Sequence, residues 1–137
     1  MPDPHPFYAR VLEEVMNRIT HFDLYADDPE RAARFYQNVF SWRTEKWTGG
    51  MDYWLITTGP DNEPGINGGL GKRRDLADRT TNTVDVASLE DVEARILAAG
   101  GRVLEPRRNI PGVGWFALCT DTEGNRFGLM QADAGAK

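Results

Sequence analysis

The sequence has little that could cross-link the chain or anchor it in a membrane. Its only cysteine, Cys119, excludes an intramolecular disulfide and is compatible with a reducing compartment. It contains no apolar run of about 18 residues, and its N-terminal stretch lacks the apolar segment of a secretory signal. We therefore expect a cytoplasmic protein with no membrane partner.

Positive charge is also scarce. The chain has 16 Lys and Arg against 21 Asp and Glu, a net charge of −5. Binding to a phosphate backbone depends on clustered basic side chains, and the one such cluster, at 72–74, is short. Phosphate loops, nucleophile elbows and CxxC pairs are absent as well. These absences predict no nucleic-acid partner. The length of 137 residues predicts a single ordinary domain.

What the sequence does contain is a near repeat with a spacing of 60 residues. Positions of the same kind recur in order: Leu24, Ala26, Asp28, Ala32 and Tyr36 in the first copy, and Val84, Val86, Ser88, Val92 and Ile96 in the second. Further along, Trp54 is echoed by Trp115, and the Gly-Gly-Leu ending at Leu70 by the Phe-Gly-Leu ending at Leu129. A duplicated unit allows each position to be compared with its counterpart.

The first copy begins with a strand and a helix. Alternation over 19–26 predicts a strand with Phe22, Leu24 and Ala26 on its core face. Asp28 is a suitable N-cap and Pro29 a suitable first helical residue. Short apolar segments separated by turn residues predict three more strands, at 42–47, 53–58 and 66–70.

The second copy repeats this order, so each unit is predicted as βαβββ. A strand over 81–86 precedes a helix capped by Ser88, with Asp91 three residues on, and Gly100 and Gly101 end that helix. The remaining strands are expected at 102–104, 114–120 and 125–130, with a hairpin turn at 121–124.

These elements divide the chain into one domain with two modules. Residues 18–131 form the domain, with the first module at about 18–71 and the second at about 80–131. Residues 1–17 lie outside the repeat and are interpreted either as an arm or as a leading helix over 8–18. Residues 132–137 are expected to be a frayed tail.

The duplicated unit resembles the vicinal oxygen chelate superfamily. The resemblance rests on the stretch His21-Phe22-Asp23-Leu24, the Asp-capped helix and the closing Asp121-x-x-Gly124-Asn125 turn. That superfamily includes glyoxalase I, extradiol dioxygenases, and the bleomycin and fosfomycin resistance proteins. Segments 35–42, 65–70, 110–115 and 124–131 are further similar to a bacterial glyoxalase-like subgroup related to lactoylglutathione lyase. The resemblance implies an α+β fold whose paired modules form a curved, cup-shaped mixed β-sheet with helices on its convex face, often as a homodimer.

The resemblance also implies a divalent metal with four ligands, on the first and last strands of each module. Typical ligands are His or Gln on the first strand and Glu on the last. In this chain those positions fall on His21, Gly69, Gly128 and Thr81, or on Asn82 if the second copy slips by one residue. One imidazole, one hydroxyl and two glycines do not supply a metal centre of this kind. We expect no metal and no other cofactor; a divalent metal in a non-standard site is the alternative.

The glycines at the last-strand positions have two interpretations. They leave room for a ligand in a groove, or they permit a bulge or tight curvature of the sheet. If the groove exists, alternation and the repeat predict its lining. It comprises His21, Asp23, Tyr25, Gly69, Thr81, Thr83, Asp85, Arg126, Gly128 and Met130, with Trp54 or Trp115 as a wall.

Three functions compete on these observations. The first is binding of a small organic molecule without a metal, as in proteins that sequester their ligand. The second is an enzyme, a lyase, isomerase or dioxygenase, that uses a non-standard metal site or uses His21 and Asp23 as acid and base. The third is an interaction module that pairs with a second copy. We favour the first, with a small-molecule ligand and a homodimer as the expected partners.

Overall fold

The computed structural model describes residues 16–133, which fall into two compact units. The first unit comprises residues 20–83, and the second comprises residues 84–133 together with 16–19. The division falls within the strands Arg18–Ala26 and Thr81–Asp85, which are described with the first and the second unit, respectively. Each unit is described by itself. Most of the proposed leading helix lies outside the described residues. Its last residue, Arg18, is the first residue of a strand, so a helix reaching that position is wrong.

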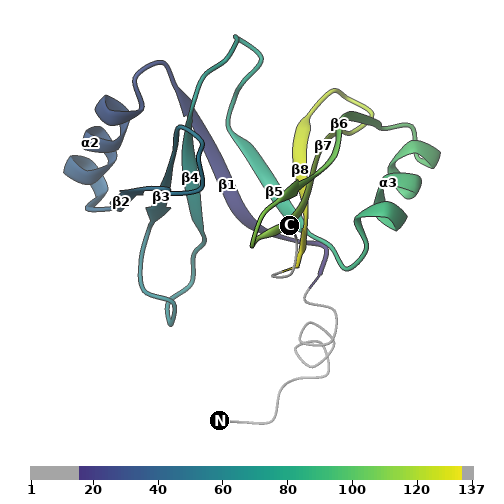
Figure 1. Cartoon of the computed structure of the whole chain (residues 1–137), viewed down its shortest axis with the longest axis horizontal. Helices are drawn as coiled ribbons and strands as arrows, with labels where there is room; N and C mark the ends of the chain where they lie inside the picture. Colours follow the sequence, from purple (N-terminus) through teal and green to yellow (C-terminus); the bar gives the residue numbers. More distant parts are fainter. Residues whose placement is uncertain (1–15, 134–137) are drawn as a thin grey trace. The chain divides into compact units, whose positions relative to one another are not determined.

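The first unit has the predicted βαβββ order (Figure 1). Its elements are β1 (Arg18–Ala26), α2 (Pro29–Phe40), β2 (Arg43–Lys46), β3 (Tyr53–Thr57) and β4 (Asn67–Lys72). The strands lie in the order β2-β3-β4-β1. β1 and β4 are parallel, and the other neighbours in this order are antiparallel. The sheet is therefore mixed, as the resemblance implied.

Helix α2 begins where the sequence predicts. The Asp28 side chain accepts a hydrogen bond from the backbone N–H of Arg31 at 3.1 Å, and Pro29 is the first helical residue. The helix ends at Ser41, which has a left-handed φ of 61°. Its buried Ala33 packs with Ile56 and Leu70 of the sheet, both 1% exposed.

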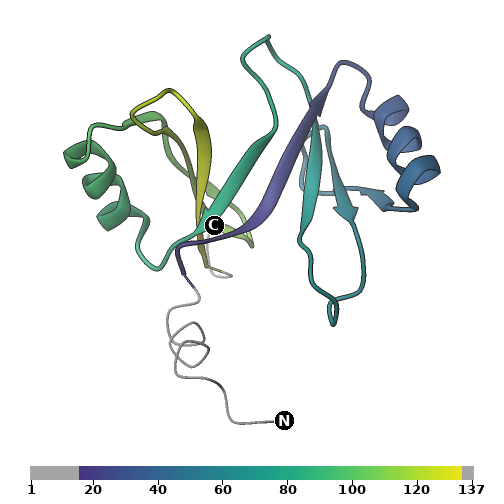
Figure 2. The same cartoon turned by 180° about the vertical axis from the view of Figure 1, so that it is seen from behind.

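The second unit repeats the order (Figure 2). Its elements are β5 (Thr81–Asp85), α3 (Leu89–Ala98), β6 (Arg102–Ile110), β7 (Gly114–Thr120) and β8 (Arg126–Ala132), and the strands lie in the order β5-β8-β7-β6. Ser88 caps α3 by accepting from the backbone N–H of Asp91 at 3.2 Å. Gly100, with a φ of +95°, follows the helix as predicted.

Two boundaries of the second unit differ from the sequence predictions. β6 extends to Ile110 instead of ending near Leu104. It includes Pro106, which an edge strand tolerates, and the pairing of β6 with β7 shifts register on both sides of Glu105. The tail is not frayed at its beginning, because Ala132 ends β8 and the backbone N–H of Asp133 donates to Val113 at 3.0 Å.

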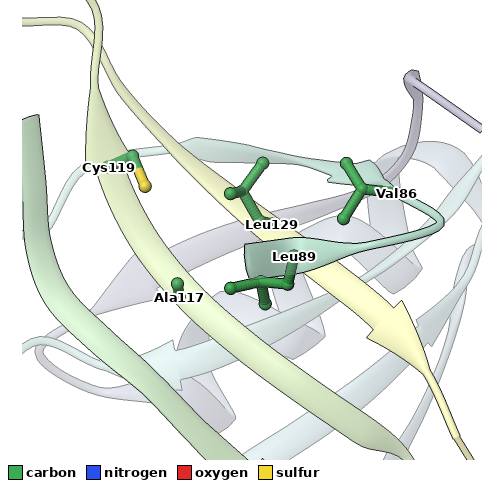
Figure 3. Packing of buried hydrophobic residues seen from close by; sticks show 5 residues of the cluster. All are labelled: Val86, Leu89, Ala117, Cys119 and Leu129. Carbon is green, nitrogen blue, oxygen red and sulfur yellow. The ribbon is translucent and has the colours of Figure 1, made fainter. Parts of the chain in front are cut away.

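The core of the second unit lies between α3 and the sheet. Figure 3 shows Leu89, the first residue of α3, among side chains of β7 and β8. The buried cluster consists of Val86, Leu89, Ala117, Cys119 and Leu129. Each of these side chains is 0% or 1% exposed.

The structure confirms the α+β class and the two βαβββ units. It also confirms the predicted strand phase, since Phe22, Leu24 and Ala26 pack against the core under α2, and Val84 and Val86 against the core under α3. None of the helices in residues 16–133 has the length and apolar character that a membrane span requires.

Candidate functional site

His21 and Asp23 lie on the face of the first-unit sheet that points away from α2. Their neighbours Phe22 and Leu24 pack on the core beneath the helix, so alternation along β1 places the odd-numbered side chains on the opposite face. The two candidate acid–base residues therefore share one surface, as the sequence predicted.

Tyr53 of β3 joins this pair. Its hydroxyl donates a hydrogen bond to Oδ1 of Asp23 at 2.5 Å, and Nε2 of His21 lies 2.8 Å from the same hydroxyl oxygen. Nε2 of His21 also lies 3.2 Å from Oδ1 of Asp23. Three side chains from β1 and β3 thus form a closed hydrogen-bonded triangle.

The environment keeps the Tyr53 phenol neutral. Burial, reinforced by the charge of Asp23 and the hydrogen bond to it, raises the pKa of Tyr53 far above its usual range. Because the hydroxyl donates to Asp23, its oxygen accepts from His21, which assigns the proton of the neutral imidazole to Nε2. Nδ1 of His21 has no hydrogen-bond partner among the described residues, and 35% of this side chain is exposed. That nitrogen is available as an acceptor.

Gly69 lies directly under the Tyr53 hydroxyl. A methyl group on Gly69 would overlap the hydroxyl oxygen and the end of the ring. On the same strand β4, a methyl group on Gly68 would come within 2.7 Å of the Phe22 ring on the other face. β4 pairs with β1 and β3 without a register shift, so a bulge is the wrong explanation for these glycines. The space above Gly69 is taken by the chain itself.

The donors of the first unit do not fit the divalent metal that the resemblance implies. Gly69 has no side chain, and a neutral phenol occupies the position from which a carboxylate would project. Nε2 of His21 is already engaged by Tyr53 and Asp23. In the described part of the chain, no three His, Cys, Asp or Glu side chains gather closely enough to hold one metal ion.

The other predicted residues of the first unit fall on both faces of its sheet. Tyr25 shares the face of His21, since a methyl group on Gly71 would lie 3.4 Å from the Tyr25 ring and 3.8 Å from the Tyr53 ring. Trp54 lies on the opposite face, against the core under α2. There it lines a depression of about 420 Å³ at the start of that helix. Trp54 is therefore not a wall of the His21 face.

That depression carries charges of both signs. Its lining consists of Asp27, Asp28, Pro29, Glu30, Lys46, Asp52, Trp54 and Lys72. The Lys46 ammonium pairs with Asp52 at 3.3 Å and lies 4.8 Å from the centre of the Trp54 ring. Lys46 is therefore paired within the chain. The lining contains no histidine, and so no pair like His21 and Asp23.

The remaining predicted residues lie on β5, β7 and β8. Thr81 and Thr83 are buried; the Thr81 hydroxyl donates to the carbonyl of Arg79 at 2.8 Å. In the second unit, Trp115 packs on the core beneath α3 and so lies on the helix side. Leu129 belongs to the same core, so alternation puts the remaining predicted residues of β8 on the face away from α3: Arg126, Gly128 and Met130.

Sequence reasoning missed Tyr53 and Trp47. The Trp47 ring stands edge-on to Tyr53 with centroids 6.0 Å apart. A signal for Tyr53 was present in the repeat, because Trp54 matches Trp115 and both face a helix. The residue before Trp54 must then point to the opposite face, where His21 lies.

Comparison with solved structures supports the same fold. The chain is similar to methylmalonyl-CoA epimerase from Streptomyces coelicolor, a variant in complex with 2-nitronate-propionyl-CoA, with a TM-score of 0.63 and 20% identity over 89% of this chain and 99% of that one. It is also similar to methylmalonyl-CoA epimerase from Mycobacterium tuberculosis, with a TM-score of 0.63 and 14% identity over 86% and 89% of the two chains. A third match is a Legionella pneumophila structure described as an NAD-dependent benzaldehyde dehydrogenase, with a TM-score of 0.61 and 13% identity over 82% of this chain and 98% of that one.

At these identities the solved structures establish the fold alone. A comparison with curated proteins finds no match. The family model described as a glyoxalase-like domain matches residues 18–130, which is nearly the whole described chain. This match shows that the chain belongs to the glyoxalase-like domain family, in agreement with its duplicated βαβββ units.

Proposed function

We propose that the first-unit face around His21 and Asp23 binds a small organic molecule, and does so without the divalent metal that the resemblance implies. The observation that carries the proposal is the Tyr53 hydroxyl, which lies over Gly69 and bonds to both residues. A tyrosine in this place fills the position of a metal-binding carboxylate and holds the imidazole that would otherwise be a ligand. What remains open to a ligand is a polar surface with an available imidazole nitrogen.

A binding experiment on metal-free protein tests this proposal. The full chain, dialysed against a chelator, is screened against a library of small soluble compounds while NMR follows the His21 and Tyr53 side chains. We expect some compounds to perturb these signals, and we expect added Mg²⁺, Mn²⁺, Ni²⁺ or Zn²⁺ to leave thermal stability unchanged.

Two results would contradict the proposal. One is a library in which no compound perturbs this face. The other is native protein that copurifies with a stoichiometric metal whose removal abolishes every binding event. Tyr53→Phe serves as the matched variant, because it keeps the ring over Gly69 and removes only the hydroxyl that holds His21 and Asp23.

A second candidate function, metal-free acid–base catalysis, is favoured by one further feature of the triangle. Nδ1 of His21 has no partner among the described residues, while Nε2 is held by Tyr53 and Asp23. If Nδ1 takes a proton from a bound molecule, the electron pair of the broken bond stays on that molecule. The imidazolium then lies 3.2 Å from the Asp23 carboxylate, which stabilises its charge.

Exchange of substrate protons with solvent deuterium distinguishes catalysis from binding alone. We expect ligands found in the screen to exchange a proton in the presence of the wild-type chain, and we expect His21→Gln to stop exchange, with the fold retained and with ligand still bound at saturating concentration. Exchange that persists in His21→Gln would remove His21 from this role. Binding with no exchange for any ligand would leave the first proposal alone standing.

A further inference from the structure

Aromatic side chains flank a glycine strip on the His21 face of the first unit. Tyr25 and Tyr53 are both paired with Gly71, and their rings lie on either side of it. Trp47 continues this row, since its backbone N–H donates to Tyr53 at 2.8 Å and its ring stands at 78° to the tyrosine ring. Three aromatic rings therefore stand in one row with no side chain on Gly71 between the two tyrosines.

A carboxylate with no Lys or Arg partner among the described residues lies in the next row. Asp23 is only 14% exposed, and its hydrogen-bond partners are the Tyr53 hydroxyl and His21. No Lys or Arg of the described chain forms an ion pair with it. Glu45 falls in the same row through the pairing of β2, β3 and β4, and is exposed. When His21 is neutral, Asp23 and Glu45 make this part of the face negative.

Arg43 is the one basic side chain that strand pairing places on this face of β2. It is paired with Thr57, one row further along than Glu45, at the edge of the sheet. An anionic ligand at the aromatic row would face Asp23 and Glu45 on one side of the row. On the other side the Arg73 guanidinium donates to the Tyr25 carbonyl at 3.2 Å, and its charge is already paired with Asp27 at 3.3 Å. The two carboxylates favour a cationic ligand over an anionic one such as the 2-nitronate-propionyl-CoA of the epimerase structure from Streptomyces coelicolor.

We propose that the molecule bound at this face is an organic cation, a quaternary ammonium or protonated amine, held by the Asp23 carboxylate and the rings of Tyr25, Tyr53 and Trp47. This inference rests on the proposed function and names its ligand class. Aromatic faces attract an ammonium through the ring quadrupole, and a partly buried carboxylate gains most from a partner that completes its charge pairing. The neutral Tyr53 hydroxyl orients the carboxylate without competing for that charge.

Choline and its neutral isostere 3,3-dimethylbutan-1-ol provide the test, since the two differ only by nitrogen or carbon at the branched centre. Each is titrated into the full, metal-free chain while NMR follows the side-chain signals of Trp47, Tyr53 and His21. We expect choline to bind in the millimolar range and the alcohol to bind about tenfold more weakly, the loss expected when a charge on an aromatic and carboxylate site is removed. Acetate should not compete.

Variants assign the effect to this face. Asp23→Asn keeps the shape and a hydrogen-bond acceptor and should weaken choline binding about tenfold. Trp47→Leu should weaken it severalfold and serves if Asp23→Asn fails to fold. Asp52→Asn makes the same charge change in the depression on the opposite face and should leave choline binding unchanged.

Equal binding of choline and the alcohol, competition by acetate, or no choline binding at tens of millimolar would overturn the cation assignment. So would choline binding that Asp23→Asn and Trp47→Leu leave unchanged. If neutral or anionic compounds from the library still perturb His21 and Tyr53, the proposed function stands and only its ligand class is wrong. If no compound does, the proposed function fails as well.

Discussion

The two units share one pattern of helix and strands but differ in what occupies their sheets. The buried cluster of the second unit consists of Val86, Leu89, Ala117, Cys119 and Leu129, whereas that of the first consists of Ala33, Ile56 and Leu70. The first unit instead stacks partly exposed rings: Tyr36 on Trp42 at 5.2 Å, and Phe40, which is 56% exposed, on Trp42 at 5.2 Å. The polar triangle also belongs to the first unit.

This difference indicates a division of roles between two copies of one pattern. The second unit has the more completely buried apolar core, and apolar burial is the dominant favourable term in folding. The first unit holds partly buried polar groups in a defined geometry, as a binding or catalytic site requires. Substitutions at matched positions of the repeat test this division directly.

The largest effect is expected from Leu129→Ala compared with Leu70→Ala. These leucines occupy the same place in the two copies and are both 1% exposed. Each substitution should lower the free energy of unfolding by about 2–5 kcal/mol, and Leu129→Ala should cost more because its surroundings are fully buried and collapse less. Urea denaturation of both variants measures the difference. A larger loss for Leu70→Ala would reverse the comparison.

Gly69→Ala is expected to have the next largest effect. The new methyl group forces the Tyr53 ring away from His21 and Asp23, which we expect to cost about 2 kcal/mol in lost hydrogen bonds and strain. Urea denaturation measures this loss. The double variant Gly69→Ala/Tyr53→Ala controls for the cause: its loss should be smaller than the sum of the two single losses. Strict additivity would show that Tyr53 is not what requires the glycine.

Tyr53→Phe should cost about 1 kcal/mol at neutral pH, because the ring stays and only the hydroxyl bonds are lost. The wild-type chain should also lose stability in alkali that this variant keeps. The pKa of Tyr53 is raised in the folded state above its ordinary value of about 10, so its contribution is complete below that pH and is lost as pH rises beyond it. Denaturation at a series of pH values, with phenolate absorbance as a second readout, measures both effects. Identical alkaline profiles for the two chains would contradict the prediction.

The smallest effect is expected at Cys119, in the core of the second unit. Burial raises the pKa of its thiol to about 11, so little thiolate exists at neutral pH. A thiol reagent should leave the folded chain unmodified for hours and react at once in urea. Rapid reaction in the absence of urea would mean that the second unit opens readily and does not have the more secure core.

Local elements were predictable wherever their signals were local. The caps at Asp28 and Ser88 and the glycine after α3 were identified correctly, because each depends on a few adjacent residues. The predicted end of β6 was wrong, because Pro106 indicates the end of a strand unless that strand is known to lie at a sheet edge.

The candidate site was predictable only in part. Alternation placed His21, Asp23 and Tyr25 on one face, as the structure confirms. It offered a ligand groove, a bulge or tight curvature for Gly69. The bulge is wrong, and the space directly above the glycine is taken by Tyr53. The filling side chain, Tyr53, comes from a different strand, 30 residues beyond Asp23.

The sequence by itself determined the duplicated βαβββ pattern, both helix starts, the end of the second helix and the faces of the strands, because caps and alternation act over neighbouring residues. Only the tertiary structure decided what lies over the glycines. That depends on strand register and on how far a tyrosine ring reaches across the sheet: Tyr53 is paired with Gly71, yet its hydroxyl lies over Gly69. No local pattern encodes that reach, since it is set by packing between strands that are distant in the chain.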